Sequence, residues 1–197
     1  QPFGDNPGDA NLRLDYLTDG EVLETAFVFF PGAQIATAFG GDGISGAAST
    51  GILGGTTGRH PTAVPTVFAW NDLDGLVNLN DDAFGGNPDN VMAYAQAYVV
   101  NTTLSPMDVH LGISSDDSVQ VLLNEEEVWF HSFARAGADA CNPQDFSPDG
   151  VNFADPHVLV PGENSLIVKV WDGGGGWNFA IRFQSAAGEP ITEGLEV

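Results

Sequence analysis

Asp116 and Asp117 are the two residues whose types and spacing point most directly to chemistry. They are adjacent within the polar segment 114–118, SSDDS, which separates two runs of alternating apolar residues. Neighbouring carboxylates repel each other, and either a cation or backbone N–H donors relieve that repulsion. Calcium prefers oxygen ligands of this kind, so this pair is the first candidate for a calcium site. The alternative is a solvated turn in which Asp and Ser side chains cap backbone groups.

A second oxygen-rich segment lies at residues 71–75, NDLDG. Its alternating oxygen-bearing side chains, closed by a glycine, are similar to the first half of a calcium-binding loop. The twelfth position of such a loop falls on Asp82, where an EF-hand carries Glu, so an EF-hand is not supported. We predict Asp72 and Asp74 as ligands of a calcium site of another kind, with a solvated hairpin turn as the alternative.

Trp171, Asp172 and Trp177 flank four consecutive glycines at 173–176. Glycines let the backbone turn sharply and let a ligand approach closely. The two indole rings could stack on the apolar face of a sugar ring, while Asp172 accepts hydrogen bonds from its hydroxyl groups. We therefore predict a ligand-binding site at these three residues. The alternative is that both indoles fill the end of the core.

Arg135 is one of five basic residues and lies at the start of a long polar segment, 135–155, that is rich in Asp and Asn. A guanidinium can form paired hydrogen bonds with a carboxylate or with sugar hydroxyls. We include Arg135 among the predicted ligand-binding residues. An ordinary structural ion pair with a nearby aspartate is the alternative.

Short strands are expected to position these groups. Apolar and polar residues alternate at 109–113 and at 119–123, and a third apolar run follows at 128–133. The connections are too short for a crossover helix, so we expect antiparallel hairpins, with the aspartate pair in the loop of the first. The turn at 161–164, PGEN, predicts a further hairpin between the apolar runs on either side of it.

Residues 91–100, VMAYAQAYVV, predict a strand that is covered on both sides. The alternation places alanines and valines on one face, and Met92, Tyr94, Gln96 and Tyr98 on the other. A face of small residues opposite an aromatic face suits a strand between a closely packed layer and a larger core.

The composition favours many short strands over helices. The chain of 197 residues contains Gly 25 and Pro 12, with frequent Val, Phe, Asn and Asp. We predict an all-β protein, an antiparallel jelly-roll-like β-sandwich with long loops rich in Gly and Asp. The length suits one buried core, so we expect an N-terminal arm at 1–11 and a single domain at 12–197.

The charge limits the possible partners. The formal net charge is −22, from 27 acidic and 5 basic residues, which excludes binding to a phosphate backbone and disfavours an anionic membrane surface. No apolar run of 18 residues exists, so we expect no membrane insertion. Cys141 is the only cysteine and forms no intramolecular disulfide. The start at Gln1 fits a processed secretory protein or a trimmed chain, and we expect an extracellular location.

Residues 115–124, SDDSVQVLLN, resemble a signature of PA14-like and galactose-binding-like β-sandwich domains, and 157–183 is similar to the closing strands of such secreted modules. The resemblance covers residues 91–183. It implies a β-sandwich and, in the calcium-dependent sugar-binding members, an ion held by paired aspartates at the positions of Asp116 and Asp117. The sequence departs from the family at Glu125, where Gly often follows Asn.

Two functions follow as expectations. The four histidines, at 60, 110, 131 and 157, have no zinc-binding spacing, and no serine lies in a nucleophile elbow, so we do not expect an enzyme. The first expectation is a secreted, non-catalytic, calcium-dependent module whose partner is a carbohydrate. The second is a structural subunit of an extracellular filament or surface layer, in which copies of the chain assemble through the N-terminal arm and strand edges, with calcium between them.

Overall fold

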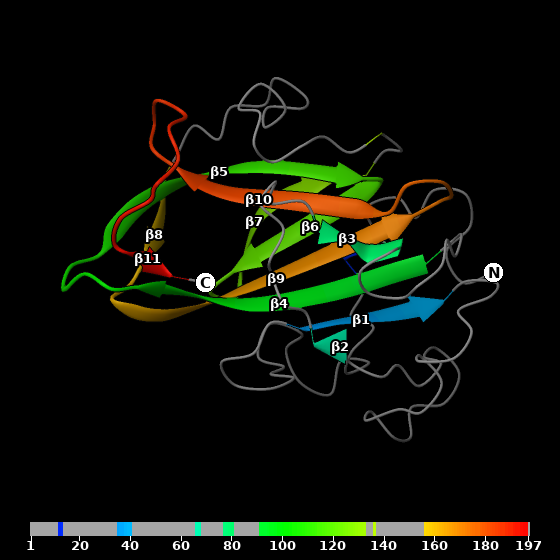
Figure 1. Cartoon of the computed structure of the whole chain (residues 1–197), viewed down its shortest axis with the longest axis horizontal. Helices are drawn as coiled ribbons and strands as arrows, with labels where there is room; N and C mark the ends of the chain where they lie inside the picture. The colour runs from blue at the N-terminus through cyan, green and yellow to red at the C-terminus, as the bar shows by residue number, and fades with distance from the viewer. Residues whose placement is uncertain are drawn as a thin grey trace.

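The structure is a computed structural model in which two antiparallel sheets face each other (Figure 1). It describes residues 12–13, 35–40, 66–67, 77–80, 91–132, 136 and 156–196, and only the backbone at 35–40, 66–67 and 91. The predicted all-β antiparallel sandwich is confirmed. The division into an arm at 1–11 and a domain at 12–197 stays a prediction, because the arm lies outside the described residues.

The larger sheet has the strand order β2-β1-β4-β9-β6-β7, with β11 paired to β4. Its strands are β1 (Ile35–Gly40), β2 (Thr66–Val67), β4 (Val91–Asn101), β6 (Ser118–Leu123), β7 (Glu126–His131), β9 (Gly162–Asp172) and β11 (Leu195–Glu196). The smaller sheet has the order β3-β10-β5-β8. Its strands are β3 (Val77–Asn78), β5 (Met107–Asp116), β8 (His157–Leu159) and β10 (Asn178–Gln184).

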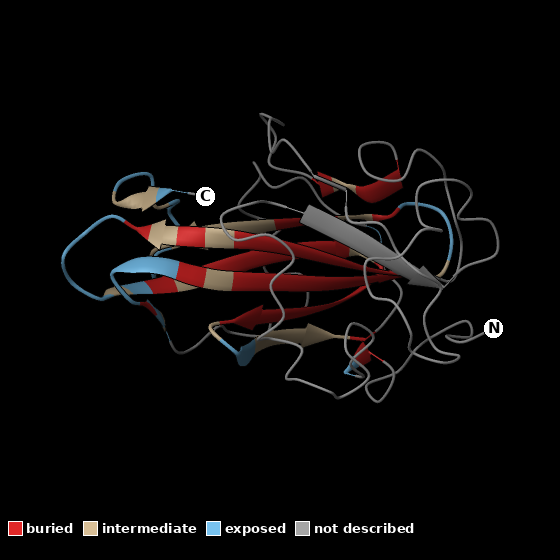
Figure 2. Cartoon of the chain, turned by 90° about the horizontal axis from the view of Figure 1, so that it is seen from below, coloured by how far each residue is buried: buried red, intermediate tan, exposed pale blue. Residues whose placement is uncertain are grey.

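The core lies between the two sheets. Ala93 and Val99 of β4 belong to the same buried cluster as Leu111 and Ile113 of β5, because alternate residues of each strand point to one face. Figure 2 shows buried residues along the middle of the strands and exposed residues in several of the turns. Burial of these apolar side chains is the main stabilising contribution to the sandwich.

The opposite face of β4 is buried as well. Met92 and Tyr94 have no exposed surface, and Gln96 is 3% exposed. On the neighbouring strand β9, Lys169 is paired with Tyr94 and is fully buried, with its Nζ 5.1 Å from the centre of the Tyr94 ring. The expectation of a strand covered on both sides is therefore confirmed.

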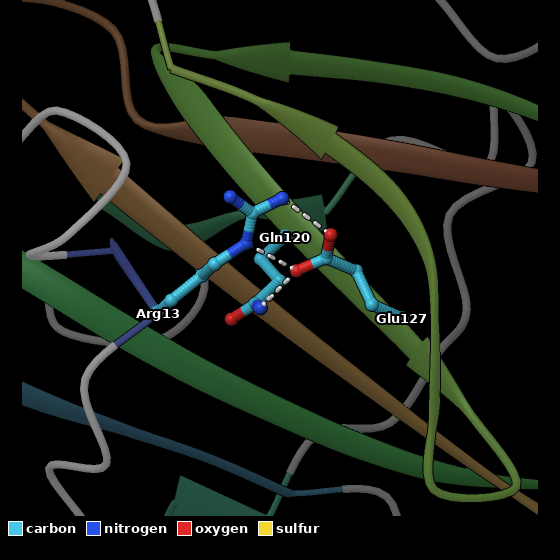
Figure 3. Close-up of polar contacts among 3 residues, drawn as sticks. All are labelled: Arg13, Gln120 and Glu127. Carbon is cyan, nitrogen blue, oxygen red and sulfur yellow. Dashed lines mark hydrogen bonds and ion pairs between the residues drawn. The ribbon is translucent and has the colours of Figure 1, made fainter.

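Arg13 connects the beginning of the described chain to the edge strand β7 (Figure 3). Its Nε and Nη2 donate to the two carboxylate oxygens of Glu127, over 2.7 and 2.5 Å. Gln120 Nε2 donates to the same carboxylate at 2.7 Å, and the guanidinium lies 3.9 Å from the centre of the Phe130 ring. Together with the fully buried Leu12, these contacts hold residues 12–13 on the sheet of their own chain.

The hairpin predicted around the aspartate pair is wrong. Strand β5 continues through Asp116 and β6 begins at Ser118, so Asp117 alone separates them. Strand β5 pairs with β10 and β8 in the smaller sheet, whereas β6 pairs with β9 and β7 in the larger one. The chain thus crosses from one sheet to the other at Asp116 and Asp117, which we call the aspartate corner.

The predicted hairpin across residues 161–164 is wrong for the same reason. Strand β8 pairs with β5, and β9 pairs with β4 and β6, so this turn also connects the two sheets. The hairpin of β6 and β7 is confirmed. Its turn residues Asn124 and Glu125 have positive φ values of 49° and 71°, as tight hairpin turns require.

Within the described part of the chain, no helix is long and apolar enough to span a membrane.

Candidate functional site

The aspartate corner meets the connection between β9 and β10 at one end of the sandwich. That connection contains residues 173–176, which we call the glycine loop, and Figure 1 shows it at the right-hand end of β9 and β10. The Asp117 N–H donates to the Trp171 carbonyl at 3.0 Å, and the Gly173 N–H donates to Asp117 Oδ2 at 2.8 Å. These two hydrogen bonds fix the position of the 7% exposed Asp117 against the glycine loop. The peptide bond between Asp116 and Asp117 is cis.

Asp116 lies on the other side of the corner, against Gly176 and Asn178. A Cβ atom added to Gly176 would overlap Asp116 Oδ2, so any larger residue there would require the carboxylate or the loop to move. Asn178 is paired with Asp116 across β10 and β5, which places both side chains on the same face of the smaller sheet. Asn178 Oδ1 is buried and accepts no hydrogen bond. A buried carbonyl oxygen without a donor is costly unless a cation or another donor meets it.

Asp172, the last residue of β9, also forms a hydrogen bond with the glycine loop. It is fully buried, and its Oδ1 accepts a hydrogen bond from the Gly174 N–H at 3.2 Å. Gly174 and Gly175 have positive φ values of 147° and 101°, which glycine adopts more readily than other residues. The sequence predicted Asp172 as a ligand-binding residue, and the described contact gives it a role in the conformation of the loop.

A third segment, residues 79–80, holds the loop from the side of β3. The Leu79 N–H donates to the Trp177 carbonyl at 2.8 Å, and Asn80 Nδ2 donates to the Gly175 carbonyl at 3.0 Å. Neither Asn80 nor Asn178 was predicted as a site residue. The only signal was the oxygen-rich character of the segment after β3, which a solvated turn would share.

The predicted stacking platform is wrong, because Trp171 and Trp177 are both fully buried. Trp177 belongs to the core cluster, and its Nε1 donates to the Val170 carbonyl at 3.3 Å. The six-membered ring of Trp171 lies under Gly173, where an added Cβ would stand 2.6 Å from Trp171 Cη2. Trp177 therefore fills the core, as the alternative interpretation had it, whereas Trp171 is buried outside that cluster, against Gly173.

Several oxygen-bearing side chains lie at this end of the sandwich. The carboxylates of Asp116 and Asp117 and the amide oxygen of Asn178 suit a hard cation such as calcium, which also accepts backbone carbonyl oxygens and water. Among the described residues, no three His, Cys, Asp or Glu side chains are grouped closely enough to form a metal site by themselves. Any calcium ion here would need amide, backbone or ligand oxygens besides the two carboxylates.

The predicted residues Asp72, Asp74 and Arg135 lie outside the described residues.

Comparisons with known proteins find neither a matching family model nor a matching curated protein. The chain is similar to PA14 domains. The PA14 domain of the antifreeze protein MpAFP is 12% identical, with 80% of this chain and 84% of that chain covered and a TM-score of 0.45. A PA14 sugar-binding domain from an RTX adhesin is 13% identical, with 81% and 93% covered and a TM-score of 0.45.

A third similar structure is an epithelial adhesin A domain from Candida glabrata in complex with β-lactose. It is 9% identical, with 83% of each chain covered and a TM-score of 0.35. These similarities agree with the resemblance noted in residues 91–183. At this level of similarity, the argument for a ligand rests on the residues of this chain.

Proposed function

We propose that this chain is a secreted, non-catalytic module that binds carbohydrate through a calcium ion. The observation that carries the proposal is the meeting of the aspartate corner with the glycine loop, together with Asn178, which pairs with Asp116 across the smaller sheet and whose buried Oδ1 accepts no hydrogen bond. Asp116 and Asp117 supply negative charge, and Asn178 supplies a neutral oxygen. Calcium takes six to eight oxygen ligands, so this set leaves coordination positions for backbone oxygens, water or a ligand.

Carbohydrate fits this site because its neighbouring hydroxyl groups are oxygen ligands that carry no charge. Calcium, when bound, would supply an electrophilic centre to which such hydroxyls coordinate. Gly174, Gly175 and Gly176 are exposed, so a ligand can approach the backbone without meeting a side chain. An anionic ligand is disfavoured by the net charge of −22.

The proposal contains no catalytic step, because both carboxylates of the corner are assigned to the ion. Extracellular calcium-binding modules have dissociation constants of about 10⁻⁴ to 10⁻³ M, a range that suits a secreted protein. The second candidate, a filament or surface-layer subunit, gains no specific support. Arg13, which follows the expected arm, contacts Glu127 of its own chain.

A glycan array tests the proposal. The chain is applied with calcium and with EGTA, beside a variant in which Asp116→Asn and Asp117→Asn remove both charges and keep the shape of the side chains. We expect glycan binding only for the unaltered chain with calcium. Binding that persists in EGTA or in the double variant would refute the role of calcium, and no binding to any glycan would refute the carbohydrate ligand.

A further inference from the structure

The glycine loop is held at successive positions by three different parts of the chain. The Gly173 N–H is bound by Asp117 of the aspartate corner, and the Gly174 N–H by Asp172 at the end of β9. The Gly175 carbonyl is bound by Asn80, which follows β3. Four consecutive glycines have more conformational freedom than any other sequence, so a defined loop conformation depends on such contacts.

The position of Asn80 follows from strand pairing. Strand β3 pairs with the first two residues of β10, Asn78 with Asn178 and Val77 with Phe179. The next two residues of the chain therefore pass beside the end of the glycine loop. There the fully buried Leu79 fixes the backbone through its hydrogen bond to the Trp177 carbonyl, and this leaves the Asn80 amide directed at Gly175.

We propose that Asn80 is a positioning residue, which holds the glycine loop in the conformation that faces Asp116 and Asp117. Its role in ligand binding rests on the proposed calcium-dependent function. Asn80 itself is not assigned to the ion. Its amide hydrogen bond to the Gly175 carbonyl limits the number of conformations open to Gly174, Gly175 and Gly176, so the site is preorganised before an ion or sugar arrives.

The direct test compares Asn80→Leu, which has a similar volume and no donor, with Asn80→Gln, which retains an amide. The matched control is Asn101→Leu. Asn101 is also buried and also donates its Nδ2 to loop carbonyls, those of Ser105 and Leu159. It lies at the opposite end of the eleven-residue strand β4, about 33 Å from the end that pairs with Asp172.

Calcium affinity is measured by titration with calcium chloride alone, and loop mobility by amide hydrogen exchange of residues 173–176 in EGTA. For Asn80→Leu, we expect the calcium dissociation constant to rise about five- to tenfold, as the loss of one hydrogen bond implies, and exchange in the loop to become faster. Asn80→Gln is expected to show a smaller change in both measurements. Asn101→Leu is expected to lower the melting temperature without changing either of them.

The outcomes separate the two proposals. If the unaltered chain binds no calcium, the proposed function fails, and the role of Asn80 in it fails as well. If the unaltered chain binds calcium and Asn80→Leu binds equally well with unchanged exchange, only the inference about Asn80 fails. Should Asn80→Leu not fold, Asn80→Ala is measured in the same way, because it removes the amide without adding an apolar side chain.

Discussion

Gly176 stands so close to Asp116 that a single added methyl group would overlap the Asp116 Oδ2 atom. The φ angle of Gly176 is not positive, so alanine is disfavoured there by contact with the carboxylate and not by backbone conformation. The residue type at position 176 and the place of the carboxylate are therefore coupled, because the Asp116 carboxylate occupies the space that a Cβ atom would need.

Gly176→Ala is predicted to displace Asp116 or the loop and to weaken calcium binding at least tenfold, since loss of one coordinating carboxylate removes a charged ligand. Calorimetric titration with calcium measures the effect. Gly188→Ala is the control, because Gly188 has a positive φ of 82° and no atom within 4 Å of an added Cβ. This control should lower stability and leave calcium affinity unchanged. Equal affinities for Gly176→Ala and the unaltered chain would contradict the prediction.

Asn164 is predicted to hold the corner between β8 and β9. It is fully buried, and its amide group makes five hydrogen bonds, to the Val160 N–H, Asn124 Nδ2 and the carbonyls of Val99, Val160 and Gly162. Asn164→Ala leaves these groups without partners and should cost about 2–4 kcal/mol of unfolding free energy. Urea denaturation measures the cost.

The neighbouring Glu163 is exposed and serves as the control for Asn164. Glu163→Gln should change the unfolding free energy by less than about 0.5 kcal/mol. If Asn164→Ala also changes the unfolding free energy by less than about 0.5 kcal/mol, the hydrogen bonds of Asn164 contribute little to stability.

Glu127 gives stability a dependence on pH. Its hydrogen bonds from Arg13 are the main cause that lowers its pKa below 4.5, and burial opposes them. Because the pKa is lower in the folded state, the stabilisation is fully present above the ordinary pKa and is lost as the pH falls through the folded pKa. Glu127→Gln should therefore reduce stability at neutral pH, and the difference from the unaltered chain should shrink in acid below about pH 4.

Thermal unfolding from neutral to acid pH measures this difference. The side chains of Arg13 and Glu127 are 44% and 32% exposed, so the contribution of this ion pair to stability should not exceed about 1 kcal/mol. A difference between Glu127→Gln and the unaltered chain that grows on acidification would contradict the assignment.

Arg13 is predicted not to be replaceable by lysine. Its guanidinium contacts both Glu127 oxygens and lies over the Phe130 ring, and an ammonium group lacks the planar fork that makes both contacts at once. Arg13→Lys should therefore lose most of the stability that Arg13→Ala loses, about 1 kcal/mol in total. Denaturation of both variants measures this, and full stability in Arg13→Lys would show that charge alone suffices.

The alternation of polar and apolar residues predicted β4, β5 and β6 and the two covered faces of β4, whereas β1 and β3 were not predicted from it. It could not show which strands pair. Strands β5 and β6 have the same alternation whether they form a hairpin or cross between sheets, because alternation records which face is buried and not which strand lies beside it. Ser114 and Ser115 added to the error, since both are polar and yet buried within β5.

The candidate site was predictable only in part. Asp116 and Asp117 stood out because adjacent carboxylates are chemically distinctive, whereas the burial of Trp171 and Trp177 depends on the packing of both sheets. Asn80 and Asn178 are 98 positions apart in the sequence and approach the same loop only through the pairing of β3 with β10. A single asparagine carries no signal of such a contact.

The most direct test of the account is the effect of calcium on thermal stability of the unaltered chain and of the Asp116→Asn, Asp117→Asn double variant. With a dissociation constant of about 10⁻⁴ to 10⁻³ M, about 10 mM calcium should stabilise the unaltered chain by about 1.4–2.7 kcal/mol. The double variant should not respond to calcium, and magnesium should not replace calcium for the unaltered chain. An equal response of both proteins to calcium, or no response of the unaltered chain, would contradict a calcium site at the aspartate corner.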